Sequence, residues 1–187
     1  MRNNMKKLIF VLLIGLLVCT AAFADHPGLG IGVVLGGGGG LNGGSFYPGL
    51  SLKLPGSPVF WGLYASLHKY YSGFTVTGDF YIFDRDLIST TATNEEGTYK
   101  VKIDWFLGLG GAINMNFWQR QNRDDAGVGF GLGLRIPVGL SWHVVRPFEI
   151  ALSLVPTFPG LYVANGNAWL WWDISVELAL RYWFVNK

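Results

Sequence analysis

The sequence YKVKIDWFLGLGGAINMNF, residues 99–117, decides the fold of this chain. Its odd-numbered positions are nearly all large and apolar, whereas lysine, aspartate, asparagine, glycine and alanine fill most even-numbered positions. Successive side chains of a β-strand point to opposite faces, so this period of two predicts a strand with one face in an apolar medium. Strands of globular proteins usually have about 5–6 residues, whereas a tilted strand that crosses a membrane needs about 9–11. The stretch therefore predicts a transmembrane β-strand.

The beginning of the chain has the pattern of a secretory signal peptide. Basic residues precede an apolar run at residues 8–18, and Ala22-Phe23-Ala24 has the small-x-small pattern that signal peptidase recognises. We therefore expect a cleaved signal peptide at residues 1–24 and a single domain at residues 25–187. Two alternatives stay open: lipidation of Cys19, although Val18 stands where such a signal normally has a small residue, and retention of the segment as a membrane anchor.

Cleavage changes what the composition implies. The 163 remaining residues carry 11 basic and 12 acidic side chains, so the charge gives no reason to expect a nucleic-acid partner. Cleavage also removes the single cysteine, which excludes disulfides and cysteine-ligated metals. Charged residues make up 14% of the chain, compared with about 25% in soluble domains. So little charge would hardly cover the surface of a soluble barrel.

The same alternation along the rest of the chain predicts eight strands. They span residues 28–35, 46–54, 59–69, 74–83, 99–117, 126–142, 148–155 and 169–184. Between them we expect a glycine-rich loop at 36–45, turns at 55–58 and 71–73, a polar segment at 84–98, a loop at 118–125 and a loop through 165–167. Eight strands are the smallest closed membrane barrel. The prediction is an all-β fold, an eight-stranded antiparallel transmembrane up-and-down β-barrel.

The side chains on the two faces indicate which face is outside. The less apolar face is mostly glycine, alanine and serine, and so has too little charge to be the typical surface of a soluble barrel. This favours a membrane barrel, and a soluble barrel stays as the alternative. The other face has large apolar side chains, with aromatic residues near strand ends, where girdles form at membrane interfaces. The expected girdle residues are Trp61, Trp105, Trp142, Trp172, Tyr182 and Phe184.

The predicted inward face carries equal numbers of acidic and basic residues. The bases are Lys53, Lys100, Lys102, Arg135 and Arg181, and the acids are Asp79, Asp104, Glu149, Asp173 and Glu177. A charge in a narrow lumen is costly unless it is paired, so this balance predicts a network of ion pairs. The network either fills the lumen as a structural plug or gates a small conductance. For Arg135 we expect Glu149 and Asp104, on flanking strands, as partners.

Other chemistry has weaker support. No glycine run completes G-x-G-x-x-G or a P-loop, so we expect no nucleotide or other cofactor. Ser66, His68 and Asp79 could approach one another on adjacent strands, and such a set would suit acyl transfer on membrane lipid. His68 is more simply a hydrogen-bonding residue of the lumen. Three scattered histidines give little support for a metal site.

The mature chain resembles the small eight-stranded outer-membrane proteins of the OmpA, OmpX and OmpW kind. In such proteins the last strand ends in alternating residues that the barrel-assembly machinery recognises, and Leu178, Leu180, Tyr182 and Phe184 are similar. The resemblance implies the outer membrane of a diderm bacterium, contact with its lipids, both termini in the periplasm and long loops outside. It suggests a non-enzymatic barrel for envelope integrity or surface-loop interactions, with a narrow channel and a lipid-modifying enzyme as alternatives.

Residues 84–98 do not fit this topology easily. Strand counting from a periplasmic N-terminus puts this segment on the periplasmic side, where turns are usually short. Either the flanking strands extend beyond the membrane and join near residues 94–97, or a strand is misassigned. The sequence leaves both alternatives open.

Overall fold

The computed structural model describes residues 28–40, 43–68, 71–94, 97–119, 126–145 and 147–184. The predicted signal peptide, residues 1–24, lies outside these ranges. The strands are β1 (Leu29–Gly40), β2 (Gly43–Lys53), β3 (Val59–His68), β4 (Tyr71–Asn94), β5 (Gly97–Gln119), β6 (Ala126–Arg135), β7 (Val138–Val145), β8 (Phe148–Ala164) and β9 (Asn167–Phe184). Within the described residues, no helix is long and apolar enough to cross a membrane.

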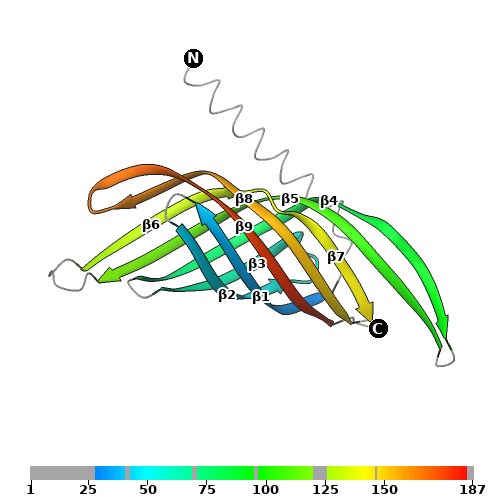
Figure 1. Cartoon of the computed structure of the whole chain (residues 1–187). Coiled ribbons are helices and arrows are strands. Elements are labelled where there is room, and N and C mark those ends of the chain that lie inside the picture. The colour runs from blue at the N-terminus through cyan, green and yellow to red at the C-terminus, as the bar shows by residue number, and fades with distance from the viewer. Residues whose placement is uncertain are drawn as a thin grey trace, which may run out of the picture.

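The strands close into an antiparallel ring (Figure 1). Each strand from β1 to β5 pairs with the next, and β1 pairs with β9 to close the ring. β6 and β7 both lie between β5 and β8, one after the other, and so occupy a single position. Nine strands therefore build an eight-stranded ring, which confirms the predicted barrel.

The predicted strand at residues 126–142 is in fact two strands. It is interrupted at Ile136 and Pro137, because proline has no N–H to donate to the ladder. Around the break, the N–H of Ile136 donates to the carbonyl of Pro156 at 2.9 Å, and the N–H of Gly108 donates to the carbonyl of Pro137 at 2.7 Å. The ring therefore stays bonded across the interruption, and the alternation of faces continues into β7.

Several strands are longer than predicted. The glycines expected in a loop at 36–45 belong to β1 and β2, where Gly36 to Gly40 pair with residues on both neighbouring strands. The turn expected at 71–73 is wrong, since β4 begins at Tyr71, and β5 continues to Gln119 in the predicted loop at 118–125. Composition misled in each case, because small or polar residues can still form the inward face of a strand.

The predicted strand at residues 148–155 was also too short, because β8 continues to Ala164. The added part of β8 contains Pro156 and Pro159. The structure accommodates them with an irregularity between Thr157 and Gly160 that interrupts the pairing with β9. The predicted loop through 165–167 is a two-residue turn, in which Asn165 and Gly166 have φ of 50° and 75°, as tight hairpin turns require.

The alternation predicted for residues 99–117 and 169–184 is present in space. Along the second half of β9, the side chains alternate strictly between exposed and buried. Large apolar side chains are outside and most charged ones are inside, the reverse of a soluble protein. An apolar exterior of this kind requires lipid around it.

The extension of the flanking strands through residues 84–98, which the first alternative predicted, is confirmed. β4 continues to Asn94 and β5 starts at Gly97, with Asn94 opposite Gly97 at the end of their ladder. The polar residues therefore extend the strands instead of ending them. Two register shifts, between Tyr81 and Phe83 and between Asp86 and Ile88, lie along this part of β4.

Adjacent glycines on β5 provide a test of the two faces. A Cβ on Gly110 would overlap the Asp79 carboxylate and approach the Gly78 backbone, whereas a Cβ on Gly111 would meet nothing closer than 3.8 Å. We expect Gly110→Ala to lose about 1–3 kcal/mol through overpacking. Gly111→Ala should be neutral or slightly stabilising. Urea unfolding of both variants in lipid vesicles measures the difference, and equal effects would contradict the assigned faces.

Leu134, which is exposed on the outer wall, tests the contact with lipid. We expect Leu134→Arg to cost roughly 2–4 kcal/mol, the usual penalty for a cation near the bilayer midplane, whereas Leu134→Met should be tolerated. Unfolding in vesicles measures both. An arginine tolerated as well as methionine would mean that this wall faces water.

Candidate functional site

The centre of the barrel is crossed by one arginine held by two carboxylates. Arg135 lies at the end of β6 and reaches Asp79 on β4, with Nε to Oδ1 and Nη2 to Oδ2 both at 3.1 Å. The same Nη2 donates to Glu177 on β9 at 2.9 and 3.1 Å from its two oxygens. The hydroxyl of Tyr64 on β3 donates to Glu177 at 2.9 Å. Four strands from different sides of the ring thus meet at one buried cluster, which we call the Arg135 layer.

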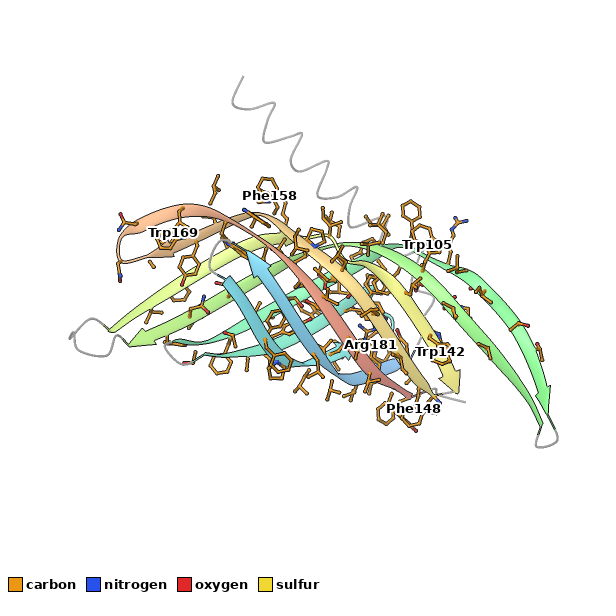
Figure 2. All side chains as sticks on the ribbon, in the orientation of Figure 1. Trp105, Trp142, Phe148, Phe158, Trp169 and Arg181 are labelled. Carbon is orange, nitrogen blue, oxygen red and sulfur yellow. The ribbon has the colours of Figure 1, made fainter. Side chains whose placement is uncertain are left out.

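A second arginine layer lies nearer the end of the barrel that holds the described ends of β1 and β9. Arg181 donates to Glu149 at 2.9 Å and to the hydroxyl of Ser51 at 2.9 Å. The indole N–H of Trp183 donates to the other Glu149 oxygen at 2.6 Å. The guanidinium of Arg181 also lies 4.9 Å from the centre of the Phe60 ring. We call this buried cluster the Arg181 layer (Figure 2).

The expected partners of Arg135 were wrong, and the register explains why. Arg135 is opposite Gly110, and Gly110 is opposite Asp79, so these three residues form one row across β6, β5 and β4. Because Gly110 has no side chain, Arg135 and Asp79 can meet above it. Glu149 is directly opposite Arg181 instead, and Asp104 is six residues away from Gly110 along β5.

A third cluster of charges lies where β7 joins β5. Lys102 Nζ is 2.9 Å from Asp86 and 3.1 Å from Asp104, and His143 Nδ1 is 3.5 Å from Asp104. Lys102 is opposite His143, at the last position where β5 pairs with β7, and so lies at the edge of the closed ring. Burial alone would lower the pKa of Lys102, but the hydrogen bonds that its ammonium donates to both aspartates outweigh burial and raise this pKa above the ordinary value.

Lys53 and Asp173 are the other predicted lumen residues whose side chains the structure describes. Lys53 is buried, and its Nζ donates to the carbonyl of Leu54 at 3.1 Å and lies 5.8 Å from the centre of the Phe60 ring. Asp173 is half-buried on β9, four residues before Glu177. The side chain of Lys100 lies outside the described part of the structure.

Stacked aromatic rings fill the space beside the Arg181 layer. The ring of Tyr81 lies between Phe60 and Phe106, with centroids 4.3 and 4.4 Å apart, and Trp183 meets Phe60 edge-on. The sequence analysis missed Phe106, which is 1% exposed. Its even-numbered position among inward residues of β5 was the available signal. A cavity of about 20 Å³, large enough for one water molecule, remains among these rings and the two arginine layers.

The aromatic residues predicted for the girdle are at the outer surface. Trp61, Trp142, Trp172, Tyr182 and Phe184 are exposed, and Trp105 is half-buried against Phe83 with ring centroids 6.2 Å apart. Figure 2 shows Trp142 and Phe148 toward the end of the barrel where the C-terminus lies, and Trp169 toward the opposite hairpin. Aromatic side chains therefore lie near both ends of the apolar wall, as membrane interfaces favour.

The register separates the residues considered for acyl transfer. His68 is opposite Tyr71, whereas Asp79 is opposite Phe60, so the two rows are eight positions apart along β3. At about 3.3 Å per residue this is roughly 26 Å. Asp79 is also held by Arg135. Within the described ranges, no group of three or more histidine, cysteine or acidic side chains could hold a metal ion.

A closed ring, an apolar wall with aromatic ends and buried ion pairs inside the ring define the fold of small outer-membrane β-barrels. The structure is similar to that of Neisserial surface protein A, with a TM-score of 0.51 and 11% identity over 83% of this chain and 96% of that chain. At this identity the likeness concerns the fold alone.

Two other solved structures are similar over a comparable share of the chain. The N-terminal barrel of OprF from Pseudomonas aeruginosa has a TM-score of 0.45 with 10% identity over 82% of this chain and 97% of that chain. A major outer membrane protein of Thermus thermophilus has a TM-score of 0.37 with 12% identity over 82% of this chain and 99% of that chain. No protein-family model and no curated protein sequence matches the chain.

The Arg135 layer provides a stability test. Arg135→Met should lose about 3–5 kcal/mol, because it leaves Asp79 and Glu177 buried without their cation. The triple variant Arg135→Met, Asp79→Asn, Glu177→Gln removes the charges together and should recover much of that loss. Unfolding in vesicles measures both variants. A mild single variant, or a triple variant no more stable than the single, would show that stranded carboxylates are not the cause.

Proposed function

We propose that this protein is a non-enzymatic outer-membrane barrel with an occluded lumen, which contributes to envelope integrity or presents loops at the cell surface. The observation that carries the proposal is the Arg135 layer, in which a 5% exposed arginine binds carboxylates of two other strands. A solute that passed this level would have to separate buried opposite charges, at a cost typical of breaking buried ion pairs.

Glycines opposite the large inward side chains support an occluded lumen. A Cβ on Gly36 would overlap the Tyr47 ring, one on Gly129 would overlap Tyr162, and one on Gly160 would overlap Trp171. Each of these side chains occupies space that a side chain at the glycine would need. An eight-stranded barrel has just enough interior for its own side chains, and this packing uses that space.

The exterior supports the cellular setting of the proposal. The apolar outer wall suits contact with lipid. The similarity in fold to Neisserial surface protein A suggests the outer membrane of a diderm bacterium. Leu178, Leu180, Tyr182 and Phe184 alternate outward along the end of β9 and would be read by the barrel-assembly machinery. A narrow channel for small solutes is the alternative that the next experiment separates from this proposal.

Single-channel recording in planar bilayers tests the occlusion. The wild type should show no steady conductance. Because two layers close the lumen in series, Arg135→Ala and Arg181→Ala should each stay closed, and only the double variant should leak. Arg85→Ala, which removes an exposed arginine of β4, is the control.

A steadily conducting wild type would overturn the occluded barrel in favour of the channel. A single variant that conducts as much as the double variant would show that the two layers do not close the lumen independently.

A further inference from the structure

β4 and β5 continue past the end of the barrel at which β1 starts and β9 ends. The pairing of β4 with β3 ends at Phe80, and the pairing of β5 with β7 ends at Lys102. Beyond these positions the described strands pair with each other as far as Asn94 and Gly97. We call residues 84–94 and 97–104 the ribbon, which includes the last three residues of β5 that still pair with β7. Figure 1 shows it running well beyond the C-terminal end of β9 and curving as it leaves the barrel.

The ribbon has one apolar and one polar face. Ile88 is opposite Ile103 on the apolar face. Val101 lies on the same face, two residues before Ile103 on β5. The second face carries Lys102, which is bound to Asp86 and Asp104. The alternation of the barrel wall thus continues into the ribbon.

The apolar face of the ribbon is continuous with the lipid-facing wall. Trp105 and Leu107 lie on the same side of β5, next to the ribbon and nearer the barrel. They are opposite Leu140 and Val138 of β7, which are exposed on the wall. Leu87 and Ile88 continue this surface and are 57% and 49% exposed. Exposing such an apolar surface to water costs free energy. On the proposed function, the adjoining barrel wall is already covered by lipid.

The shape and charge of the ribbon fit a membrane surface. The register shift between Asp86 and Ile88 is a β-bulge, which bends a strand and turns it out of the line of the barrel wall. Arg85 is opposite Trp105 on the apolar side and is exposed. Tryptophan is typical of the membrane interface, where a guanidinium reaches lipid phosphates and its stem stays among apolar groups.

We propose that the ribbon lies along the phospholipid headgroup layer at the end of the barrel that holds the described ends of β1 and β9. Leu87, Ile88 and Ile103 enter the boundary with the acyl chains, and Arg85 binds phosphate. The ion pairs of Lys102 hold the polar face toward water. The protein thereby contacts one leaflet over an area larger than the barrel wall alone.

Matched cysteines on the two faces test this arrangement. In a Cys19→Ser background, Ile88→Cys and Ser89→Cys each carry an environment-sensitive nitrobenzoxadiazole label, and the full chain is refolded into phosphatidylethanolamine and phosphatidylglycerol vesicles. We expect the label at position 88 to emit at shorter wavelength and to be quenched strongly by lipids spin-labelled near the headgroup. The label at position 89 should emit as in water and be quenched by aqueous iodide.

Each other outcome overturns the proposal. A label at position 88 that resembles the one at position 89 would place the apolar face in water. A shielded label at position 88 that spin-labelled lipid does not quench would indicate contact with protein, such as a second copy. Lipid quenching at both positions would mean that the ribbon is immersed. Heat-modifiable gel mobility confirms beforehand that each labelled variant has folded.

Discussion

The structure depends on the need to neutralise two arginines inside a lumen too narrow to hydrate them. A buried cation without its partner would cost several kcal/mol, so Arg135 and Arg181 determine where carboxylates must be. Asp79 and Glu177 surround the first, and Glu149 holds the second. The contacts of Arg135 join β6 to β4 and to β9, which are not its neighbours in the ring, and they therefore fix the cross-section of the barrel as well as fill it.

The glycines follow from the same constraint. An arginine or a tyrosine can cross the lumen only if the wall beneath it carries no side chain, as at Gly110 below Asp79 and Arg135 and at Gly32 below Arg181. Glycine is usually unfavourable in strands because it loses more conformational entropy than other residues. Here the loss is offset by the charged and aromatic side chains that the vacated space accommodates.

The period of two in the sequence was sufficient to predict the barrel and the side of the wall on which each residue lies. It could not predict strand ends where inward glycines resemble a loop, as at residues 36–40, or where Pro137 breaks one row into two strands. It also could not identify the partners of Arg135, because these depend on the register between β4, β5 and β6, which no local pattern encodes. Phe106 was missed because its large apolar side chain differs from the charged and small residues at the other inward positions of β5.

The hydrogen bond between Tyr64 and Glu177 joins residues 113 positions apart in the chain, on strands that become near neighbours only when β1 pairs with β9. Contacts of such long range form late, because the entropy of bringing the segments together must be overcome first. A sheet that has not yet closed would still hold its arginines and carboxylates in water or against headgroups. Closure of the seam and dehydration of the charges are therefore one event, so an intermediate with a sealed ring and an empty interior has no stable form.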